Sequence, residues 1–153
     1  MPLLTLPRLN RHLYGAADIL RKGGLDHSEF RDFIYGFIFL RRCSDVFELE
    51  RAKIFQDSLD RGASQEEAES DAEDPKEYSQ YFVPKESRWS HINETFHREI
   101  ANRLNKALQG LSYQNEILGG ITDSINFAEE FGKKTVPDIT FRELITHFNK
   151  LRL

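Results

Sequence analysis

Histidines, a cysteine and carboxylates are the side chains in this sequence that could support chemistry. The five histidines include no pair four residues apart and no His-Glu-x-x-His motif, and His91 and His97 are six residues apart. No zinc site is therefore predicted. Cys43 follows Arg41 and Arg42, whose charges could lower the pKa of its thiol, although a small residue on a packed helix is the alternative.

Sites for nucleotides and for acid–base catalysis are not indicated either. The sequence has no Gly-x-Gly-x-x-Gly and no Walker A motif, so it predicts no backbone cradle for phosphate. The carboxylates concentrate between Gln65 and Glu77, in a stretch that predicts no fixed geometry for an acid–base pair. We therefore expect no catalytic, cofactor-binding or metal-binding residue in this chain.

Basic residues remain as candidate contacts for nucleic-acid phosphates. Arg41 and Arg42 lie at the end of an apolar run, where Arg41 could contact a phosphate or pair with Asp45 four residues on. Lys133 and Lys134 follow a glycine and could contact DNA or form a solvated surface pair. The predicted DNA-binding residues are these four, Lys133, Lys134, Arg41 and Arg42.

An aromatic and a basic residue also stand together at Arg88–Trp89. The only tryptophan of the chain could stack on a nucleotide base beside the guanidinium. A tryptophan in a small helical domain more often packs in the core or an interface. Both interpretations stay open at this point.

The elements that must position these residues are built around one apolar helix. Phe33–Leu40 is apolar on every side, and Asp26 with Glu29 forms a capping-box variant ahead of it. This pattern predicts a central helix from about Asp26 past Phe47, extending toward Leu59. A helix that is apolar all round is wrapped by other helices.

Further helices are expected around this central one. Apolar spacing predicts a helix over residues 8–22, ended by Gly23–Gly24, and a long helix over about 90–109. Thr140 with Glu143 forms a capping box for a last helix. The predicted fold class is all-α, a bundle of about four to six helices around a central apolar helix, with an acidic mobile insertion.

The predicted acidic flexible segment spans residues 65–77. It contains seven acids and one base, a net charge of −6 within a total of −4, so the remainder carries +2. Its first eleven residues have only Ala68 and Ala72 as apolar side chains, too few to offset an ordering cost of roughly 1–2 kcal/mol per residue. We expect a solvated loop or a frayed helix end.

Length and composition fit a single domain. The chain has 153 residues, 39% of them hydrophobic and 30% charged, and its longest uncharged apolar run is far too short to span a membrane. One cysteine excludes an internal disulfide, and the first residues lack a secretory signal, so a cytoplasmic location is expected. The last helix lacks a stop signal, and we expect residues 1–153 to begin a longer protein.

Five segments in this order resemble one family. They are Tyr14–Arg21, Phe30–Asp45, Phe82–Trp89, Leu104–Leu108 and Leu144–Leu151. The most specific parts are Ala-Asp-Ile-Leu-Arg, Leu-Arg-Arg-x-Ser-Asp and Val-Pro-x-x-x-Arg-Trp. Together they resemble the N-terminal helical domain of the modification (methyltransferase) subunit of type I restriction-modification systems, over nearly the whole chain.

The resemblance implies the function of a larger protein. Such subunits transfer a methyl group from S-adenosylmethionine to N6 of adenine in double-stranded DNA. They assemble with a specificity subunit, a second modification subunit and a restriction subunit. The helical domain helps to clamp DNA and makes subunit contacts, with no role for a membrane.

In that family catalysis belongs to a following domain with an Asn-Pro-Pro-aromatic motif. No proline here follows an asparagine, so the catalytic domain is absent from residues 1–153 and no catalytic or cofactor residue is carried over. S-adenosylmethionine is thus expected for the parent enzyme and not for this segment. The alternative function is a stand-alone helical adaptor that binds proteins and has no enzymatic role.

Overall fold

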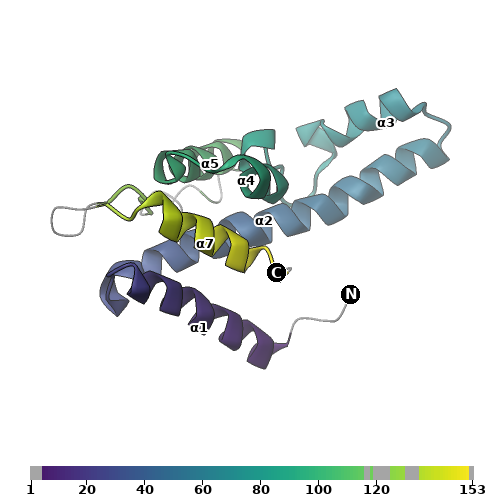
Figure 1. Ribbon diagram of the computed structural model, residues 1–153. Helices are drawn as coiled ribbons and strands as arrows, with labels where there is room; N and C mark the ends of the chain where they lie inside the picture. Colours follow the sequence, from purple (N-terminus) through teal and green to yellow (C-terminus); the bar gives the residue numbers. More distant parts are fainter. Residues whose placement is uncertain (1–4, 116–117, 119–124, 130–134, 152–153) are drawn as a thin grey trace.

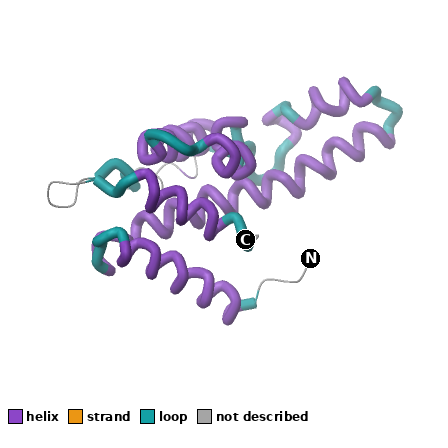
Figure 2. The backbone as a smooth tube through the Cα atoms, in the orientation of Figure 1, coloured by secondary structure: helices purple, strands orange, loops and turns teal. Residues whose placement is uncertain are grey.

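One long helix determines how the rest of the chain packs. The computed structural model describes residues 5–115, 118, 125–129 and 135–151, which form six α-helices and two short 3-10 helices without a strand (Figures 1 and 2). The elements are α1 (Leu6–Lys22), α2 (His27–Asp60), α3 (Gln65–Ala72), η1 (Pro75–Glu77), η2 (Lys85–Ser87), α4 (Trp89–Thr95), α5 (Ile100–Gln114) and α7 (Asp138–Phe148). The predicted all-α bundle is confirmed. Among these helices none is long and apolar enough to cross a membrane.

The central helix α2 is the predicted one, and it runs for 34 residues. Phe33, Phe37, Leu40 and Phe47 are at most 1% exposed. Gly36 lies on the packed side, where an added Cβ would clash with Cζ of Phe127. The glycine therefore allows the segment around Phe127 to approach the backbone of α2 closely, which explains why a weak helix former is tolerated there.

Helices α1, α4, α5 and α7 surround the first half of α2 (Figure 1). Five phenylalanine rings, whose centroids lie 5.3–5.9 Å from one or more of the others, fill the centre: Phe33, Phe37, Phe127, Phe141 and Phe148. Rings this close add to the burial energy of the core. The core therefore fixes α1 and α7 on α2, and the outward faces of these helices are available for contacts.

Helix α1 begins two residues earlier than predicted. Thr5 caps it by accepting a hydrogen bond from the Arg8 backbone amide at 3.4 Å, and Pro7 fits the first turn. Gly24, with φ of +94°, follows the helix in the left-handed region that glycine favours. The predicted end at Gly23–Gly24 is therefore confirmed.

The helix predicted over about 90–109 is wrong as one continuous helix. α4 ends at Thr95 and α5 begins at Ile100. Glu99 between them has φ of +49°, and the Asp138 carboxylate accepts hydrogen bonds from the amides of Glu99 and Ile100 at 3.1 and 3.0 Å. A side chain distant in sequence thus caps α5, so its start has no local signal.

The start predicted for the last helix at Thr140 is also wrong. α7 begins at Asp138, and Thr140 is buried inside the helix at 6% exposure. It packs against Gly23, where an added Cβ would lie 3.1 Å from the threonine side chain. The residues that resemble a capping box therefore serve tertiary packing.

Residues 65–77 were expected to be too polar to pack, and that expectation is wrong. Ser64 caps α3, and Ala68 and Ala72 are 0% exposed. The Ser58 hydroxyl donates to the Asp71 carboxylate at 2.5 Å, and the Tyr78 hydroxyl donates to the Ala72 carbonyl at 2.6 Å. Together with the second half of α2, α3 forms a projecting arm (Figure 1). The predicted mobility of this segment stays a prediction.

Candidate nucleic-acid interface

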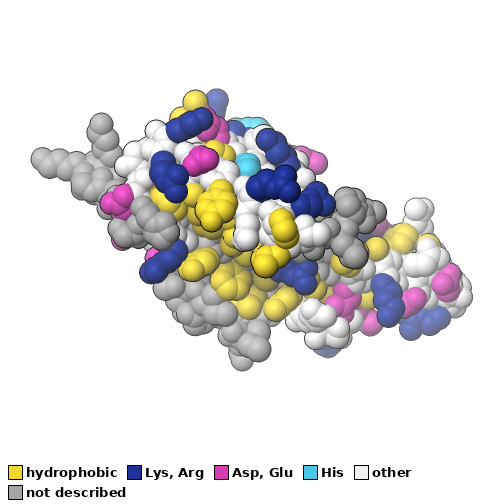
Figure 3. Space-filling view, turned by 90° about the horizontal axis from the view of Figure 1, so that it is seen from below, with side chains coloured by type: hydrophobic (Ala, Val, Ile, Leu, Met, Phe, Trp, Pro, Cys, Tyr) yellow, Lys and Arg dark blue, Asp and Glu magenta, His cyan; other side chains and the backbone are white. Residues whose placement is uncertain are grey.

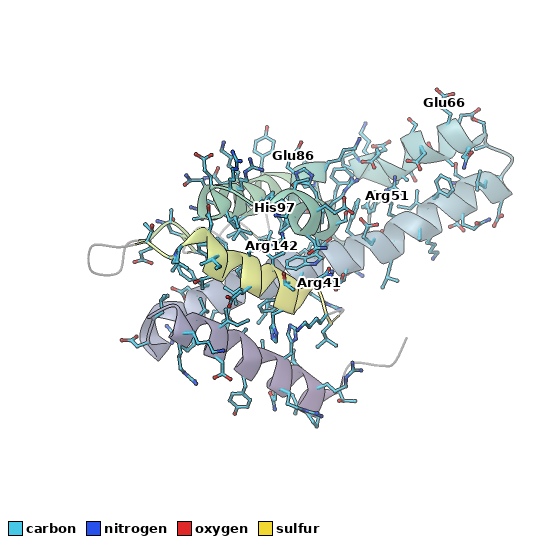
Figure 4. The ribbon with its side chains drawn as sticks, in the orientation of Figure 1. Arg41, Arg51, Glu66, Glu86, His97 and Arg142 are labelled. Carbon is cyan, nitrogen blue, oxygen red and sulfur yellow. The ribbon has the colours of Figure 1, made fainter. Side chains whose placement is uncertain are left out.

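Of the four residues predicted to contact DNA, Arg41 and Arg42 lie among the described residues. Lys133 and Lys134 lie outside them. Arg41 makes an ion pair with Asp45 at 3.3 Å and donates from Nε to the Leu151 carbonyl at 3.3 Å, with only 11% of its side chain exposed (Figure 4). Arg42 is exposed on the neighbouring side of α2. The predicted i, i+4 pair is confirmed, whereas phosphate binding by Arg41 and Arg42 stays a prediction.

Arg88 and Trp89 belong to the packed interior. The Arg88 guanidinium donates to both oxygens of Glu73 at 3.0 and 2.7 Å, and it lies 4.5 Å from the centroid of the Phe47 ring. Trp89 is 3% exposed and donates from Nε1 to Oδ1 of Asn149 at 3.0 Å. A base could not stack on Trp89 in this arrangement, so the core alternative is confirmed.

Two charged partners hold Glu73 in place. The hydrogen bonds from Arg88 are the main cause that lowers the pKa of the Glu73 carboxyl, with Arg51 adding a second contact at 3.2 Å. Figure 4 shows Arg51 between α2 and α3. The carboxylate therefore joins the arm to the body and has a structural role.

Cys43 is a packing residue. It is buried beside Phe47, Val83 and Leu111. Burial raises the pKa of its thiol to about 11, and the nearby Arg42 charge offsets only part of that effect. A thiol this reluctant to ionise is a poor nucleophile. The structural alternative for Cys43 is therefore the supported one.

Sequence reasoning missed a polar face on α5. Four exposed residues recur along this helix at intervals of four, three and four, opposite the buried stripe that contains Ile100, Leu104 and Leu111. We call this the α5 face, and it consists of Asn102, Lys106, Gln109 and Tyr113. No residue of α5 is acidic. The periodic spacing of these exposed residues was not recognised in the sequence because the predicted helix ended at about Gln109, before Tyr113.

Two arginines extend the positive charge at the start of α5. Arg98 is exposed in the break before the helix, and Arg103 donates to the Thr95 carbonyl at 3.4 Å. Three carboxylates lie near α5: Asp138, which caps its start, Glu99 just before it, and Glu86 on η2, which packs beside the helix (Figure 4). Asn, Gln, Lys and Arg side chains are those that contact phosphates and base edges in DNA complexes. The α5 face with Arg98 and Arg103 is the candidate nucleic-acid interface.

A histidine pair lies under the opposite side of the body. His12 and His147 stack with ring centroids 4.1 Å apart, and Nε2 of His147 contacts the His12 carbonyl at 2.6 Å. Burial is the main cause that lowers the pKa of His12 to about 4, aided by the charges of His147, Arg41 and Lys150. Within the described residues no group of three or more His, Cys, Asp or Glu side chains could hold a metal ion.

These features define a class of protein, a helical domain built on one long central helix with a polar, acid-free face on α5. The family model described as the HsdM N-terminal domain matches residues 9–148. The chain therefore belongs to the HsdM N-terminal domain family, the N-terminal part of the modification subunit of type I restriction-modification systems. The resemblance seen in the sequence is confirmed. No curated protein matches the chain.

Proposed function

We propose that this chain is the DNA-clamp and subunit-interaction domain of a type I adenine-specific (N6) DNA methyltransferase, and that the α5 face contacts double-stranded DNA. Family membership supports a place in a restriction-modification assembly. The observation that carries the DNA contact is the acid-free α5 with Arg98, Arg103 and Lys106 along or beside its exposed side. The stand-alone adaptor is not favoured, because the family is that of a methyltransferase subunit.

The methyl-transfer chemistry is proposed to lie in another part of the modification subunit. S-adenosylmethionine sites of that kind use a glycine-rich turn between a strand and a helix, and every regular element in the described part of this chain is helical. The proposed partners are the specificity subunit, a second modification subunit and the restriction subunit. We propose that the assembly works in the cytoplasm, where a single free cysteine stays reduced.

The clamp role requires only weak contacts from this domain. Lys and Arg contacts to phosphates release counterions and fix position without reading sequence. The isolated domain is expected to bind duplex DNA non-specifically at roughly 10⁻⁴ M or weaker at physiological salt. Within the assembly the same contacts become intramolecular, so effective concentration makes a weak surface sufficient to close a clamp.

Charge reversal on the α5 face tests this function. In the assembled enzyme, the double variant Arg98→Glu, Lys106→Glu should weaken duplex binding. The negative slope of the logarithm of the association constant against the logarithm of the salt concentration should become shallower by about two. The measurement is fluorescence anisotropy of a labelled duplex across a salt series, with N6-methyladenine formation followed in parallel. Lys53→Glu is the matched control, because Lys53 is exposed on α2 away from α5.

Two results would argue against the proposal. Equal salt slopes for the double variant and the wild type would remove the α5 face as a DNA contact. The same loss with Lys53→Glu would indicate a general effect of charge rather than a local contact. Lys133→Glu with Lys134→Glu tests the remaining predicted contacts in the same assay.

A further inference from the structure

A shallow groove runs between α1 and α7. α7 packs against both α1 and α5, which lie on opposite sides of the body in Figure 1, so the groove is separate from the α5 face. Its volume is about 350 Å³, and its lining includes Ile19 from α1 and Ile139, Glu143, Thr146 and Lys150 from α7 and its end. Nothing in the methyl-transfer or DNA-clamp roles uses this groove.

The groove has an apolar floor on a fixed scaffold. Ile139 is 70% exposed, and Ile19 is partly exposed across from it. α1 and α7 meet closely at Gly15, where an added Cβ would lie 2.6 Å from Cε1 of His147. The two walls are therefore held by close packing, and the groove exists before any partner arrives.

Cationic side chains stand along both walls. Arg142 and Lys150 line the α7 side, with Glu143 as the single acid in the lining. On α1, the helical register places Arg8 and Lys22 on the same side as Ile19, at offsets of eleven and three residues. Figure 3 views the molecule from below, the side on which α1 lies in Figure 1, and shows hydrophobic groups with Lys and Arg side chains beside them.

Arg142 is held in position rather than free to swing. Its guanidinium donates to the Phe96 carbonyl at 3.1 Å and to Oδ1 of Asn93 at 3.2 Å. On α1, the acid Asp18 is neutralised by Arg21 at 3.0 Å. The guanidinium of Arg142 is thus held toward α4, and the cations left at the edges of the groove are Lys150 on the α7 side and Arg8 and Lys22 on α1.

An apolar floor with cations at its edges distinguishes between two anionic partners, a DNA backbone and an acidic protein helix. A DNA backbone presents hydrated phosphates and gains nothing from contact with Ile139 and Ile19. An amphipathic helix places an apolar stripe in a groove while its flanking carboxylates face the cations. The geometry points to an acidic amphipathic helix of a partner subunit as the occupant of the α1–α7 groove, an inference that rests on the proposed place of this domain in a multisubunit enzyme.

Site-specific photo-crosslinking tests the assignment. The full modification subunit carrying p-benzoylphenylalanine at position 139 is assembled with the purified specificity and restriction subunits, irradiated, and analysed by mass spectrometry. We expect a crosslink to a segment of another subunit whose apolar residues recur every three or four positions with Asp or Glu beside them. Adding Lys22→Glu and Lys150→Glu should lower the crosslink yield at least fivefold. Their matched control is Lys53→Glu, Lys76→Glu, two exposed lysines outside α1 and α7.

The same crosslinker at Leu49 is the position control, since Leu49 is 62% exposed but lies on α2. It should not label that segment. Crosslinking of position 139 to DNA, to a segment without acids, or to no subunit would each overturn the assignment. DNA binding by the α5 face is measured separately with Arg98→Glu, Lys106→Glu, so failure of the groove and failure of the clamp are distinguishable.

Discussion

The imidazole of His12 shows how burial, aided by neighbouring charges, changes the chemistry of a side chain. It stacks on His147, meets the edge of Phe148 at a centroid distance of 4.9 Å, and its Nε2 is a buried atom without a hydrogen-bond partner among the described residues. A second proton, at Nε2, would have no acceptor and would face the charges of Arg41 and Lys150. The neutral form is therefore the one that fits between α1 and α7.

This environment predicts how stability depends on pH. The pKa of His12 is about 4 in the folded chain against an ordinary value of 6.5, so between those values the unfolded state binds more protons. The free energy of unfolding should have its full value above about pH 6.5. It should then decrease by up to about 3 kcal/mol as the pH drops toward 4. Urea unfolding at pH 7.0 and 4.5 measures the difference.

His12→Phe should remove most of that dependence, because a phenyl ring keeps the stacking without a titrating group. His97→Phe is the control, since His97 is exposed. If wild type and His12→Phe lost equal stability between the two pH values, another group would be responsible. Among single residues, the Arg41–Asp45 pair was predictable because it is local, whereas contact of His12 with His147 depends on the docking of two distant helices.

At the level of helices, the break between α4 and α5 shows what local sequence cannot encode. Ile92, Phe96, Ile100 and Leu104 recur every four residues and predict an unbroken helix. The break depends on Asp138, which lies 38 residues beyond Ile100 and caps α5 from the start of α7. The central helix was predictable because its apolar run and its start lie together in the sequence.

Removing the distant cap should loosen α5. Asp138→Ala deletes the acceptor for two backbone amides, and we expect a loss of about 1–2 kcal/mol in the free energy of unfolding. Hydrogen exchange should accelerate at the amides of Glu99 and Ile100 first. Asp18→Ala, which breaks an exposed ion pair, should cost less than about 0.5 kcal/mol. Unchanged exchange at Ile100 in Asp138→Ala would show that the cap is dispensable.

At the scale of the whole molecule, charge is divided between a mildly cationic body and an acidic arm. α3 carries four acids and no base, and Glu66 projects from its far end (Figure 4). Composition predicted this division but not that α3 packs as a helix. Ala68 and Ala72 are buried where α3 packs against α2, a contact that composition does not reveal. Ion pairs compensate for the small apolar area of this contact: Arg51 pairs with Glu69 and Glu73, and Arg88 pairs with Glu73.

The attachment of the arm can be tested through Arg88. Arg88→Met should leave Glu73 with Arg51 alone and destabilise the domain by about 1.5–3 kcal/mol, since it removes the hydrogen bonds from the guanidinium to the carboxylate. Amide exchange over residues 68–72 should rise more than exchange in α1. Arg61→Met, at an exposed position, is the control. If residues 68–72 exchange freely in the wild type, the arm is mobile as composition predicted, and its docked form is a minor state.

The continuity of α2 has a mechanical consequence. At 1.5 Å per residue its 34 residues span about 51 Å, without a proline to form a hinge, from the body at one end to the arm at the other. A tilt of about 5° at one end therefore displaces the opposite end by about 4 Å. Because α2 is continuous, a rotation of its first half within the body moves the arm at its other end in proportion. The position of the arm is therefore coupled to the orientation of α2 in the body.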